Sequence, residues 1–490
     1  MNRDVFENLK AAGYNRIPVY RSVLADLDTP LSVYLKLASG ADTYLLESVE
    51  GGETWGRFSF IGLPCQQRYS LSGTRLTTYR DGVAVHQEEV NDPLDYISTL
   101  QQEFNAPRLD ELPVFTGGLV GYFGYEIVQR FEPRLIDEDK PDELETPDMV
   151  MLLSEEVAVF DNLAGRLYLI VNVDPTIPDA WETAQQRLDE LAHRLRNDST
   201  GYGERIARQP VAEKDFHYGF SRGDFINAVQ KCKEYILSGD IFQVVLSQRM
   251  SVPFAARPLD VYRALRALNP SPYMYFIDLG DSQIVGSSPE VLVRVQNRQV
   301  TLRPIAGTRH RGDSPEEDQK LEEELLNDPK ERAEHLMLID LGRNDAGRVS
   351  EIGSVKVTDT MIIERYSHVM HIVSQVDGEL AEGLAAADAI RSSFPAGTLS
   401  GAPKIRAMEI INELEPVRRN VYAGAVGYIN WHDETDLAIA IRTAVIKDGM
   451  LHVQAGAGIV ADSSPELEWE ETMNKGRALI QAVNSASMGL

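Results

Sequence analysis

Two stretches of the sequence carry pairs of glutamates at a helical spacing. Glu331 and Glu334 lie three residues apart just after an Asp-Pro at 328–329, which is typical of a helix start. Glu468 and Glu471 repeat this spacing near the end of the chain. Residues at i and i+3 share a helix face, and a solvated surface is the ordinary interpretation of one such pair. Four carboxylates from two facing helices would instead form an all-oxygen site that suits Mg²⁺.

Such a site requires two helices that turn their glutamates away from the core. In the first helix, the residues predicted to face the core are Ala333, Leu336, Met337 and Leu341. In the last helix, the predicted inward-facing residues are Trp469, Met473, Gly476, Ile480 and Val483. The helical period then places Lys475 on the same face as the two glutamates of the last helix.

Two glycine-containing segments and one arginine suggest an anion-binding site. Residues 394–404 form a small-residue loop before a helix, which offers backbone N–H groups, hydroxyls and the positive end of the helix dipole. Residues 454–458 form a second loop, where glycine permits close approach of a ligand. A tight turn would explain either loop alone. Arg442 lies in a strand-like run, where a buried guanidinium needs a carboxylate from the protein or from a ligand.

Two further side chains are weaker candidates by themselves. His371 is one of nine histidines, and a lone histidine is more often structural than catalytic. Tyr422 has an equally ordinary interpretation as a half-buried strand aromatic. Neither predicts a function without its neighbours.

The composition restricts the class of protein. The 490 residues are 43% hydrophobic and 25% charged, which is ordinary for a globular chain of two or three lobes. No run of about 20 apolar residues predicts a membrane span, and no secretory signal is visible at the start. The two cysteines, Cys65 and Cys232, are far apart, which favours a reducing, cytoplasmic location. A net charge of −27 argues against nucleic acid or anionic membranes as partners.

The order of predicted elements favours an α+β fold with large antiparallel sheets. Up to about residue 205 the pattern is mostly strands and turns, with a hairpin at 157–173 and one helix at 180–195. A polar, glycine-containing linker is predicted at 197–203. Beyond it, helices alternate with hairpin strands without regular βαβ spacing. We therefore expect an N-terminal region, 1–205, and a catalytic domain, 215–485.

The candidate segments together resemble one family, the chorismate-utilising enzymes. They occur in the family's order and cover nearly all of 215–485. The matching runs are GDIFQVVLSQR (239–249), GSSPE (286–290), RPIAGTRHRG (303–312), DPKERAEHLMLIDLGRND (328–345), ERYSHVMH (364–371), FPAGTLSGAPK (394–404), YAGAVGY (422–428), IAIRTA (439–444), QAGAGIV (454–460) and EETMNKGRA (470–478). The resemblance implies a sandwich of antiparallel sheets with helices outside, in α/β/β/α layers. The N-terminal run LLESVEGGETWGRFSFIG (45–62) resembles the large subunits of anthranilate synthases.

The resemblance also implies a metal site. Glu334 and Glu471 would bind Mg²⁺ directly, while Glu331 and Glu468 would act through its water molecules. The metal would hold the ring carboxylate of chorismate.

The remaining binding residues are implied in the same way. Thr398 and backbone N–H groups around Gly456 and Gly458 would join the metal at the ring carboxylate. Tyr422 and Arg442 would bind the enolpyruvyl carboxylate, with Lys475 as a further cation. Together with the metal, these groups would reverse the local charge of a very acidic protein.

The family's chemistry assigns an acid and a base. Ammonia attacks C2 of the ring while the C4 hydroxyl leaves, and Glu290 resembles the acid that protonates this hydroxyl, which requires a raised pKa. The intermediate, aminodeoxyisochorismate, then loses its C2 proton and its enolpyruvyl group. His371 is the candidate for that proton transfer, with a titration range that suits neutral pH.

Two positions discriminate among members of the family. Isochorismate and salicylate synthases carry lysine where this chain has Gln243, and a neutral amide cannot activate water as nucleophile. Aminodeoxychorismate synthases carry lysine where this chain has Ala306, and a methyl group cannot attack the ring. Both differences favour anthranilate as the product, in the first committed step of tryptophan synthesis. The alternatives are an aminodeoxyisochorismate synthase of a secondary pathway and a tryptophan-sensing protein without turnover.

The resemblance finally implies a partner and an inhibitor. The sequence contains no glutaminase segment, so ammonia is expected from a separate glutamine amidotransferase subunit in a hetero-oligomer. L-Tryptophan is expected to inhibit allosterically by binding between two segments, with Glu47 pairing with its amino group. The residues of this inhibitor site are Glu47, Ser48, Asn269, Pro270, Ser271, Pro272, Tyr273 and Met274. A strand end packed on a loop would explain these residues nearly as well.

Overall fold

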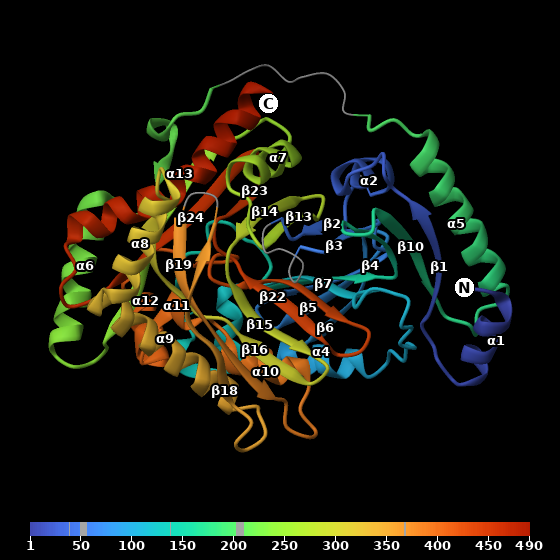
Figure 1. The fold of residues 1–490 in the computed structure, drawn as a ribbon, viewed down its shortest axis with the longest axis horizontal. Helices are drawn as coiled ribbons and strands as arrows, with labels where there is room; N and C mark the ends of the chain where they lie inside the picture. Colours follow the sequence, from blue (N-terminus) through green and yellow to red (C-terminus); the bar gives the residue numbers. More distant parts are fainter. Residues whose placement is uncertain (39, 50–55, 138, 202–209, 367–368) are drawn as a thin grey trace.

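The β-rich runs of the sequence pair into two large antiparallel sheets (Figure 1). A computed structural model of the protein describes residues 1–38, 40–49, 56–137, 139–201, 210–366 and 369–490. The first sheet has the order β1 (Ile17–Leu24), β10 (Arg166–Val173), β9 (Glu156–Asp161), β3 (Phe58–Gly62), β2 (Thr43–Glu47), β13 (Tyr273–Asp278), β14 (Ser282–Ser288), β23 (Thr443–Lys447), β24 (Met450–Ile459), β12 (Gln243–Pro253) and β11 (His217–Tyr218), with β20 (Gly401–Ala402) also on β12.

The second sheet is built in the same antiparallel way. Its order is β17 (Ile305–His310), β19 (Val369–Glu379), β16 (Gln299–Leu302), β15 (Val291–Gln296), β22 (Thr435–Ile439), β21 (Ala425–Asn430), β7 (Gly118–Phe123), β8 (Met149–Ser154), β4 (Gln67–Ser72), β5 (Arg75–Arg80) and β6 (Val83–Glu89), with β18 (Lys356–Arg365) on β19. The predicted hairpin at 157–173 is confirmed as β9 and β10.

One hydrophobic cluster joins the inner faces of the two sheets. Tyr44 and Tyr275 from the first sheet are buried together with Tyr122 and Val426 from the second. Alternate residues of a strand point to opposite faces, so each sheet turns one apolar set towards the other sheet and its second face towards the helices. The expected α+β sandwich with helices outside is confirmed.

Both sheets run through the N-terminal and the C-terminal parts of the chain. In the first sheet β2 pairs with β13, and in the second β7 pairs with β21. Each sheet therefore contains strands from both of the regions that the sequence predicts as separate. The proposed division into 1–205 and 215–485 stays a prediction, and part of its linker, 202–209, lies outside the described residues.

The helices cover the outer faces and ends of the sheets. Helices α6, α8, α9, α12 and α13 gather at one end, whereas α1 and α5 lie at the other (Figure 1). Their bounds are α1 (Arg3–Ala11), α2 (Pro30–Leu37), α4 (Pro93–Gln101), α5 (Ala180–Asn197), α6 (Arg222–Leu237), α7 (Pro258–Leu268), α8 (Pro315–Asn327), α9 (Pro329–Gly347), α10 (Ala386–Ser393), α11 (Gly397–Ser400), α12 (Lys404–Leu414) and α13 (Pro465–Met488), with short 3₁₀ helices η1 (Tyr125–Arg130), η2 (Pro133–Leu135) and η3 (Glu213–Asp215).

The predicted core faces of the two glutamate-bearing helices had different outcomes. In α13 the predicted inward stripe is confirmed, because Trp469, Met473 and Gly476 are buried. In α9 the predicted stripe is wrong: Leu336 is 51% exposed, whereas His335 is fully buried. The buried face of α9 includes His335, Leu338 and Ile339, and the Nε2 atom of His335 lies 2.7 Å from Ser374 Oγ, which satisfies this buried ring nitrogen.

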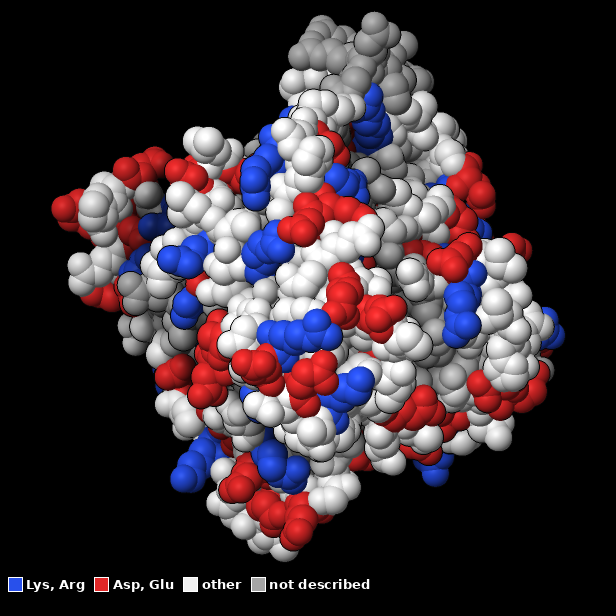
Figure 2. All heavy atoms as spheres, turned by 90° about the vertical axis from the view of Figure 1, so that its right-hand side faces the viewer, with Lys and Arg blue, Asp and Glu red and all other residues white. Residues whose placement is uncertain are grey.

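The surface and the helices add two observations. None of the helices in the described ranges combines the length and apolar character of a bilayer span. Acidic and basic side chains are interspersed on the face that carries α1 and α5, without a large area of one sign (Figure 2). The net charge is therefore not concentrated on that face.

Candidate active site

One cavity of about 550 Å³ contains every residue predicted for catalysis, substrate binding and metal binding. Strands β12 and β24, helices α9 and α13 and the loops around 290, 398, 422 and 442 contribute its walls. The predicted residues that line it are Gln243, Glu290, Glu331, Glu334, His371, Thr398, Tyr422, Arg442, Gly456, Gly458, Glu468, Glu471 and Lys475. The sequence spans more than 230 positions between the first and last of them, so only the fold brings them together.

Helix α9 places two carboxylates at one end of this cavity. The side chain of Asp328 caps the helix by accepting the N–H groups of Lys330 and Glu331 at 2.9 and 3.3 Å. One turn later, Glu334 Oε1 accepts a bond from Gln243 Nε2 at 3.2 Å. Burial raises the pKa of Glu334, and the neighbouring charges of Glu331 and Glu471 raise it further, against the bond from Gln243. A cation at this end would relieve the repulsion.

Helix α13 supplies the opposing carboxylates. Burial raises the pKa of Glu468, and the nearby Glu471 adds to this rise. The ammonium of Lys475 lies 2.7 Å from Glu471 and donates to the carbonyl of Gly456 at 2.9 Å. The carboxylate predicted to bind a metal directly is therefore paired with a protein cation.

The donor set fits a hard divalent cation. No three His, Cys, Asp or Glu side chains within the described ranges converge closely enough to hold a metal alone. Mg²⁺ needs only one or two protein carboxylates and completes its shell with water and substrate oxygens. Glu334 from α9 and Glu471 from α13 can supply those two, with Glu331 and Glu468 beside them. A bound divalent ion would then offset part of the negative charge of the four glutamates.

The other end of the cavity holds a buried carboxyl group. Glu290 lies between β14 and β15, after Pro289, and is 7% exposed. Burial raises its pKa to about 8, although a bond from Thr398 Oγ1 at 2.9 Å and the charge of Arg442 act in the opposite direction. Glu290 therefore carries a proton at neutral pH and can donate it, which is the property expected of a general acid.

His371 is a neutral imidazole in the same wall. Burial lowers its pKa to about 4, with a further decrease from Arg442. The expected titration near neutral pH is therefore wrong, because the ring is desolvated beside a cation. Its Nδ1 lies 3.1 Å from the carbonyl of Gly307, which can only accept, and 3.0 Å from Thr308 Oγ1. With Nδ1 protonated, Nε2 keeps its lone pair and can act as a base.

Arg442 lies at a break between strands and not within one. β22 ends at Ile439 and β23 begins at Thr443, and Arg442 has a φ of +49°. The expectation of a strand residue is wrong because the chain turns sharply here to face the cavity. Ala423, next to Tyr422, also has a positive φ of +62°. Such backbone strain in non-glycine residues concentrates at functional sites.

The guanidinium of Arg442 is available for a ligand. Burial lowers its pKa, but an arginine side chain stays cationic in proteins. None of the ion pairs in the described part of the chain includes Arg442. A desolvated cation without a protein carboxylate, facing a cavity, is suited to an anionic ligand.

The glycine segment 454–458 is a strand and not a loop. Gly456 and Gly458 lie in β24, paired with Ser247 and Val245 of β12. A Cβ atom on Gly456 would stand 2.8 Å from the hydroxyl of Tyr422, and one on Gly458 would stand 2.7 Å from the Gln243 amide nitrogen. The glycines are thus required by the close approach of two cavity side chains.

The predicted inhibitor residues form a separate group beside this cavity. β2 and β13 pair Glu47 with Met274, and the N–H of Val49 donates to Ser271 at 3.3 Å. The residues of this group are Glu47, Ser48, Asn269, Pro270, Ser271, Pro272, Tyr273 and Met274. A second cavity of about 290 Å³, lined by Pro272 and Tyr273, shares Pro289 with the first. Residues 50–55 lie outside the described residues.

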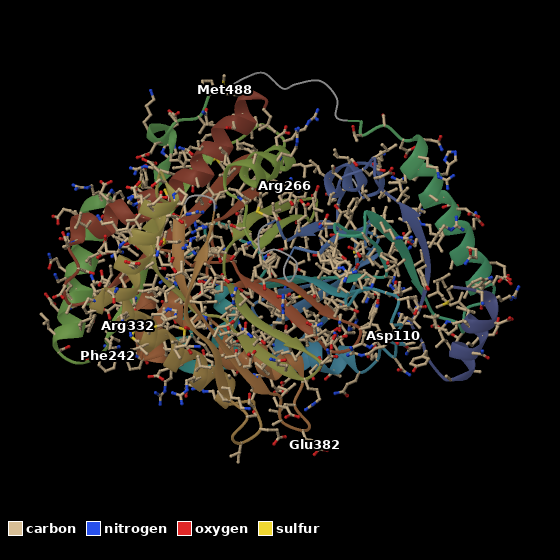
Figure 3. The ribbon with its side chains drawn as sticks, viewed as in Figure 1. Asp110, Phe242, Arg266, Arg332, Glu382 and Met488 are labelled. Carbon is tan, nitrogen blue, oxygen red and sulfur yellow. The ribbon has the colours of Figure 1, made fainter. Side chains whose placement is uncertain are left out.

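The carboxylate of Glu47 already has two partners within the chain. It is buried and accepts a hydrogen bond from the hydroxyl of Tyr262. Arg266, near the end of α7, forms an ion pair with the Glu47 carboxylate at 3.1 Å. Figure 3 labels Arg266. An amino group would have to share or replace these contacts.

Several lining residues were not predicted. Lys330 precedes Glu331 on α9, and Gln454 donates to Ser247 Oγ at 2.9 Å. The unpredicted members of the lining include Ile305, Gly307, Thr308, Lys330, Leu338, Ile441, Gln454, Ser463 and Leu479. Leu338 and Leu479 lie one or two turns after the glutamates, so continuing the glutamate-bearing face along each helix would have found both.

The family model and the known proteins that match this chain agree with each other. The family model described as chorismate binding enzyme matches residues 53–481. Anthranilate synthase component 1 of Pseudomonas putida is 58% identical over 484 residues, covering 99% of this chain and 98% of that protein. The protein of the same name from Pseudomonas aeruginosa is 57% identical, with complete coverage of both chains.

A solved structure extends the agreement to three dimensions. The crystal structure of anthranilate synthase component I from Streptococcus pneumoniae superimposes with a TM-score of 0.78 and 38% identity, covering 94% of this chain and 99% of that one. The chain belongs to the chorismate-binding enzymes and, within them, to the anthranilate synthase component 1 proteins.

Proposed function

We propose that this protein is the large subunit of an anthranilate synthase. It converts chorismate and ammonia to anthranilate, pyruvate and water, in the first committed step of tryptophan synthesis. The observation that supports this proposal is one cavity that holds a protonated carboxyl group, a neutral imidazole and an arginine that pairs with no carboxylate among the described residues. These are an acid, a base and an anchor for an anion.

Binding fixes chorismate between the two ends of the cavity. Arg442, with the hydroxyl of Tyr422, holds the enolpyruvyl carboxylate. Thr398 and backbone groups near Gly456 and Gly458 receive the ring carboxylate, with Lys475 as a further cation. The desolvation of this cavity strengthens each charge-assisted contact.

The first step exchanges the C4 hydroxyl for nitrogen at C2. Ammonia forms a bond to C2, the ring double bond moves, and the C4–O bond breaks. Glu290 gives its proton to the departing oxygen, so that water leaves instead of hydroxide, and the ammonium group formed at C2 then releases one proton, which restores the protonated Glu290. Gln243 and Ala306 both line the cavity, and neither can activate water or attack the ring, which supports ammonia as the nucleophile.

The second step makes the ring aromatic. His371 Nε2 accepts the proton from C2, and the electrons of the C2–H bond enter the ring as the C–O bond to the enolpyruvyl group breaks. The departing enolate is protonated to pyruvate. The hydrogen bond between Nδ1 and the carbonyl of Gly307 keeps the imidazole in the basic tautomer.

The four glutamates of α9 and α13 would hold Mg²⁺. A bound Mg²⁺ would neutralise and orient the ring carboxylate of chorismate. Glu334 and Glu471 would be its direct ligands, with Glu331 and Glu468 acting through water. The acidic end of the cavity is otherwise repulsive to a dianion.

Nitrogen supply and regulation involve two further molecules. A separate glutamine amidotransferase subunit would deliver ammonia in a cytoplasmic hetero-oligomer. L-Tryptophan would bind beside β2 and β13 and lower the affinity for chorismate. Ser287 supports such coupling, because its hydroxyl donates to the carbonyl of Asn269 and its N–H donates to the carbonyl of Arg442.

An assay with purified protein tests the proposal. Chorismate, ammonium and MgCl₂ should yield fluorescent anthranilate, together with one equivalent of pyruvate, and EDTA should stop both. Aminodeoxyisochorismate without pyruvate would identify an enzyme that ends after the first step. Absence of any product, with tryptophan still bound, would identify a sensor and refute the proposed activity.

A further inference from the structure

A buried ion pair lies behind the wall of the chorismate cavity. Arg419 and Glu415 have side chains that are 1% and 2% exposed, and neither lines the cavity itself. Glu415 Oε2 accepts from Arg419 Nε at 2.8 Å, and Oε1 accepts from Nη2 at 2.6 Å. The pair is therefore bidentate, which fixes the plane of the guanidinium.

The other donors of Arg419 bind the backbone beneath two walls of the cavity. Nη1 donates to the carbonyl of Leu399 at 2.8 Å, next to Thr398. Nη2 donates to the carbonyl of Val245 at 2.7 Å, two residues after Gln243 on β12. One side chain thus joins the short helix α11, which carries Thr398, to the strand that carries Gln243.

Glu415 extends this connection to the glycine strand. Its Oε1 accepts from both the N–H and the hydroxyl of Ser247, at 2.8 and 2.7 Å. Ser247 is paired with Gly456 across the sheet and accepts a bond from Gln454, a cavity residue, at 2.9 Å. The carboxylate consequently holds β12 and β24 in register behind the cavity.

Two aromatic rings and an N-terminal carboxylate complete the cluster. The guanidinium carbon of Arg419 lies 5.6 Å from the ring centre of Tyr422 and 4.8 Å from that of Tyr125. Glu126, also from η1, accepts the backbone N–H groups of Arg419 and Asn420 at 2.8 and 2.9 Å. The turn that leads to Tyr422 is therefore fixed from the N-terminal part of the chain.

We propose that the Arg419–Glu415 pair is a positioning unit for chorismate, which sets the relative places of Thr398, Tyr422 and the β12–β24 wall from behind the cavity. The proposal rests on the proposed function and adds to it residues that never touch the substrate. The pair reaches Leu399, Val245 and Ser247 by hydrogen bonds and Tyr422 by a cation–ring contact, so small movements of the pair are transmitted to the binding groups.

The chemistry of arginine explains why this position is selective. A lysine keeps the charge but has one nitrogen, which cannot reach Leu399, Val245 and both carboxylate oxygens in one plane. Arg419→Lys therefore breaks the unit while leaving no uncompensated carboxylate. Binding of chorismate, which uses both walls at once, should suffer more than the reaction of ammonia.

The experiment compares Arg419→Lys with Arg68→Lys in the full chain. Arg68 is the matched control, because its side chain is only 14% exposed, pairs with Asp42 at 2.9 Å and donates to a backbone carbonyl, but does not line the cavity. Steady-state rates with ammonium give KM for chorismate, KM for ammonium and kcat. Isothermal titration with chorismate and Mg²⁺ and thermal unfolding are measured on the same preparations.

We expect Arg419→Lys to raise KM and the dissociation constant for chorismate at least about tenfold, with KM for ammonium nearly unchanged. Arg68→Lys should lower thermal stability to a similar degree without this selective loss. Values of Arg419→Lys within twofold of the wild type overturn the proposal. The proposal is also overturned if KM rises equally for chorismate and for ammonium in both variants, since that would indicate a general structural role.

A milder variant decides the matter if Arg419→Lys does not fold. Ser247→Ala removes the hydroxyl bond to Glu415 and the bond from Gln454, keeps the backbone bond to Glu415, and should raise the dissociation constant for chorismate about threefold. An unchanged constant overturns the proposal. Failure of the wild type to form anthranilate would refute the proposed function instead, while chorismate binding would still report on the positioning unit.

Discussion

The two ends of the cavity reach a suitable charge by opposite physical means. At the helix end, which α9 and α13 form, Glu471 and Lys475 are 45% and 50% exposed and pair with each other, so two opposite charges offset each other. At the strand end, Glu290 is 7% exposed and burial makes it neutral. We therefore expect added cations to change the charge at the helix end, whereas folding alone sets the protonation of Glu290 at the strand end. Catalysis needs both, because the substrate is a dianion and the leaving group needs a proton.

The largest effect should come from the strand end. Glu290→Gln keeps the size and the neutral state of the side chain but removes the proton that the C4 oxygen must receive. We expect kcat to fall about 10²- to 10⁴-fold with KM for chorismate within a few-fold. Rates of anthranilate formation measure this. A variant that retained most of its kcat would assign the acid to another group.

The helix end should respond mainly through its requirement for metal. Glu334→Gln should raise the Mg²⁺ concentration for half-maximal activity at least about 100-fold, and Glu331→Gln about tenfold, because the second acts through water. Titration of activity with MgCl₂ gives both values. Equal effects of the two substitutions would remove the distinction between direct and water-mediated ligands.

The pH dependence sharpens the contrast. The pKa of Glu290 is raised to about 8, so the active protonated form is lost, and kcat/KM falls, as the pH increases through that value. The bond from Thr398 favours the ionised form, so Thr398→Val should move this descending limb to higher pH. The helix end contributes no comparable shift at saturating Mg²⁺. A limb that moved to lower pH would contradict the role of the hydroxyl.

The smallest effect concerns the connection between the inhibitor residues and the cavity. Ser287→Ala removes the hydroxyl contacts with Asn269 and Ser271 but keeps the backbone bond to Arg442. Inhibition by tryptophan should weaken about three- to tenfold, with uninhibited rates nearly unchanged. Initial rates at several tryptophan concentrations test this. Strictly competitive inhibition, unchanged in this variant and in Ser48→Ala and Pro270→Ala, would refute the assigned site.

The sequence predicted best those features that depend on local helix chemistry or on long matches to the family's motifs. The Asp328 cap and the α13 stripe follow from local chemistry, and the matched motifs placed every predicted active-site residue in one cavity. It failed where a partner distant in sequence decides the outcome. The buried His335 has its hydrogen-bond partner in Ser374, and Glu47 forms an ion pair with Arg266 on a helix more than 200 residues away. The kink at Arg442 likewise depends on strands that meet only in the folded sheet.

The pairing of β2 with β13 and of β7 with β21 has a practical consequence for engineering. Separating the two parts of the chain would leave β2, β13, β7 and β21 without these partners, and such exposed edge strands invite aggregation. The proposed inhibition by tryptophan would therefore not be removable by deleting one part of the chain. Single substitutions that leave both strand pairings intact are the way to test and change it.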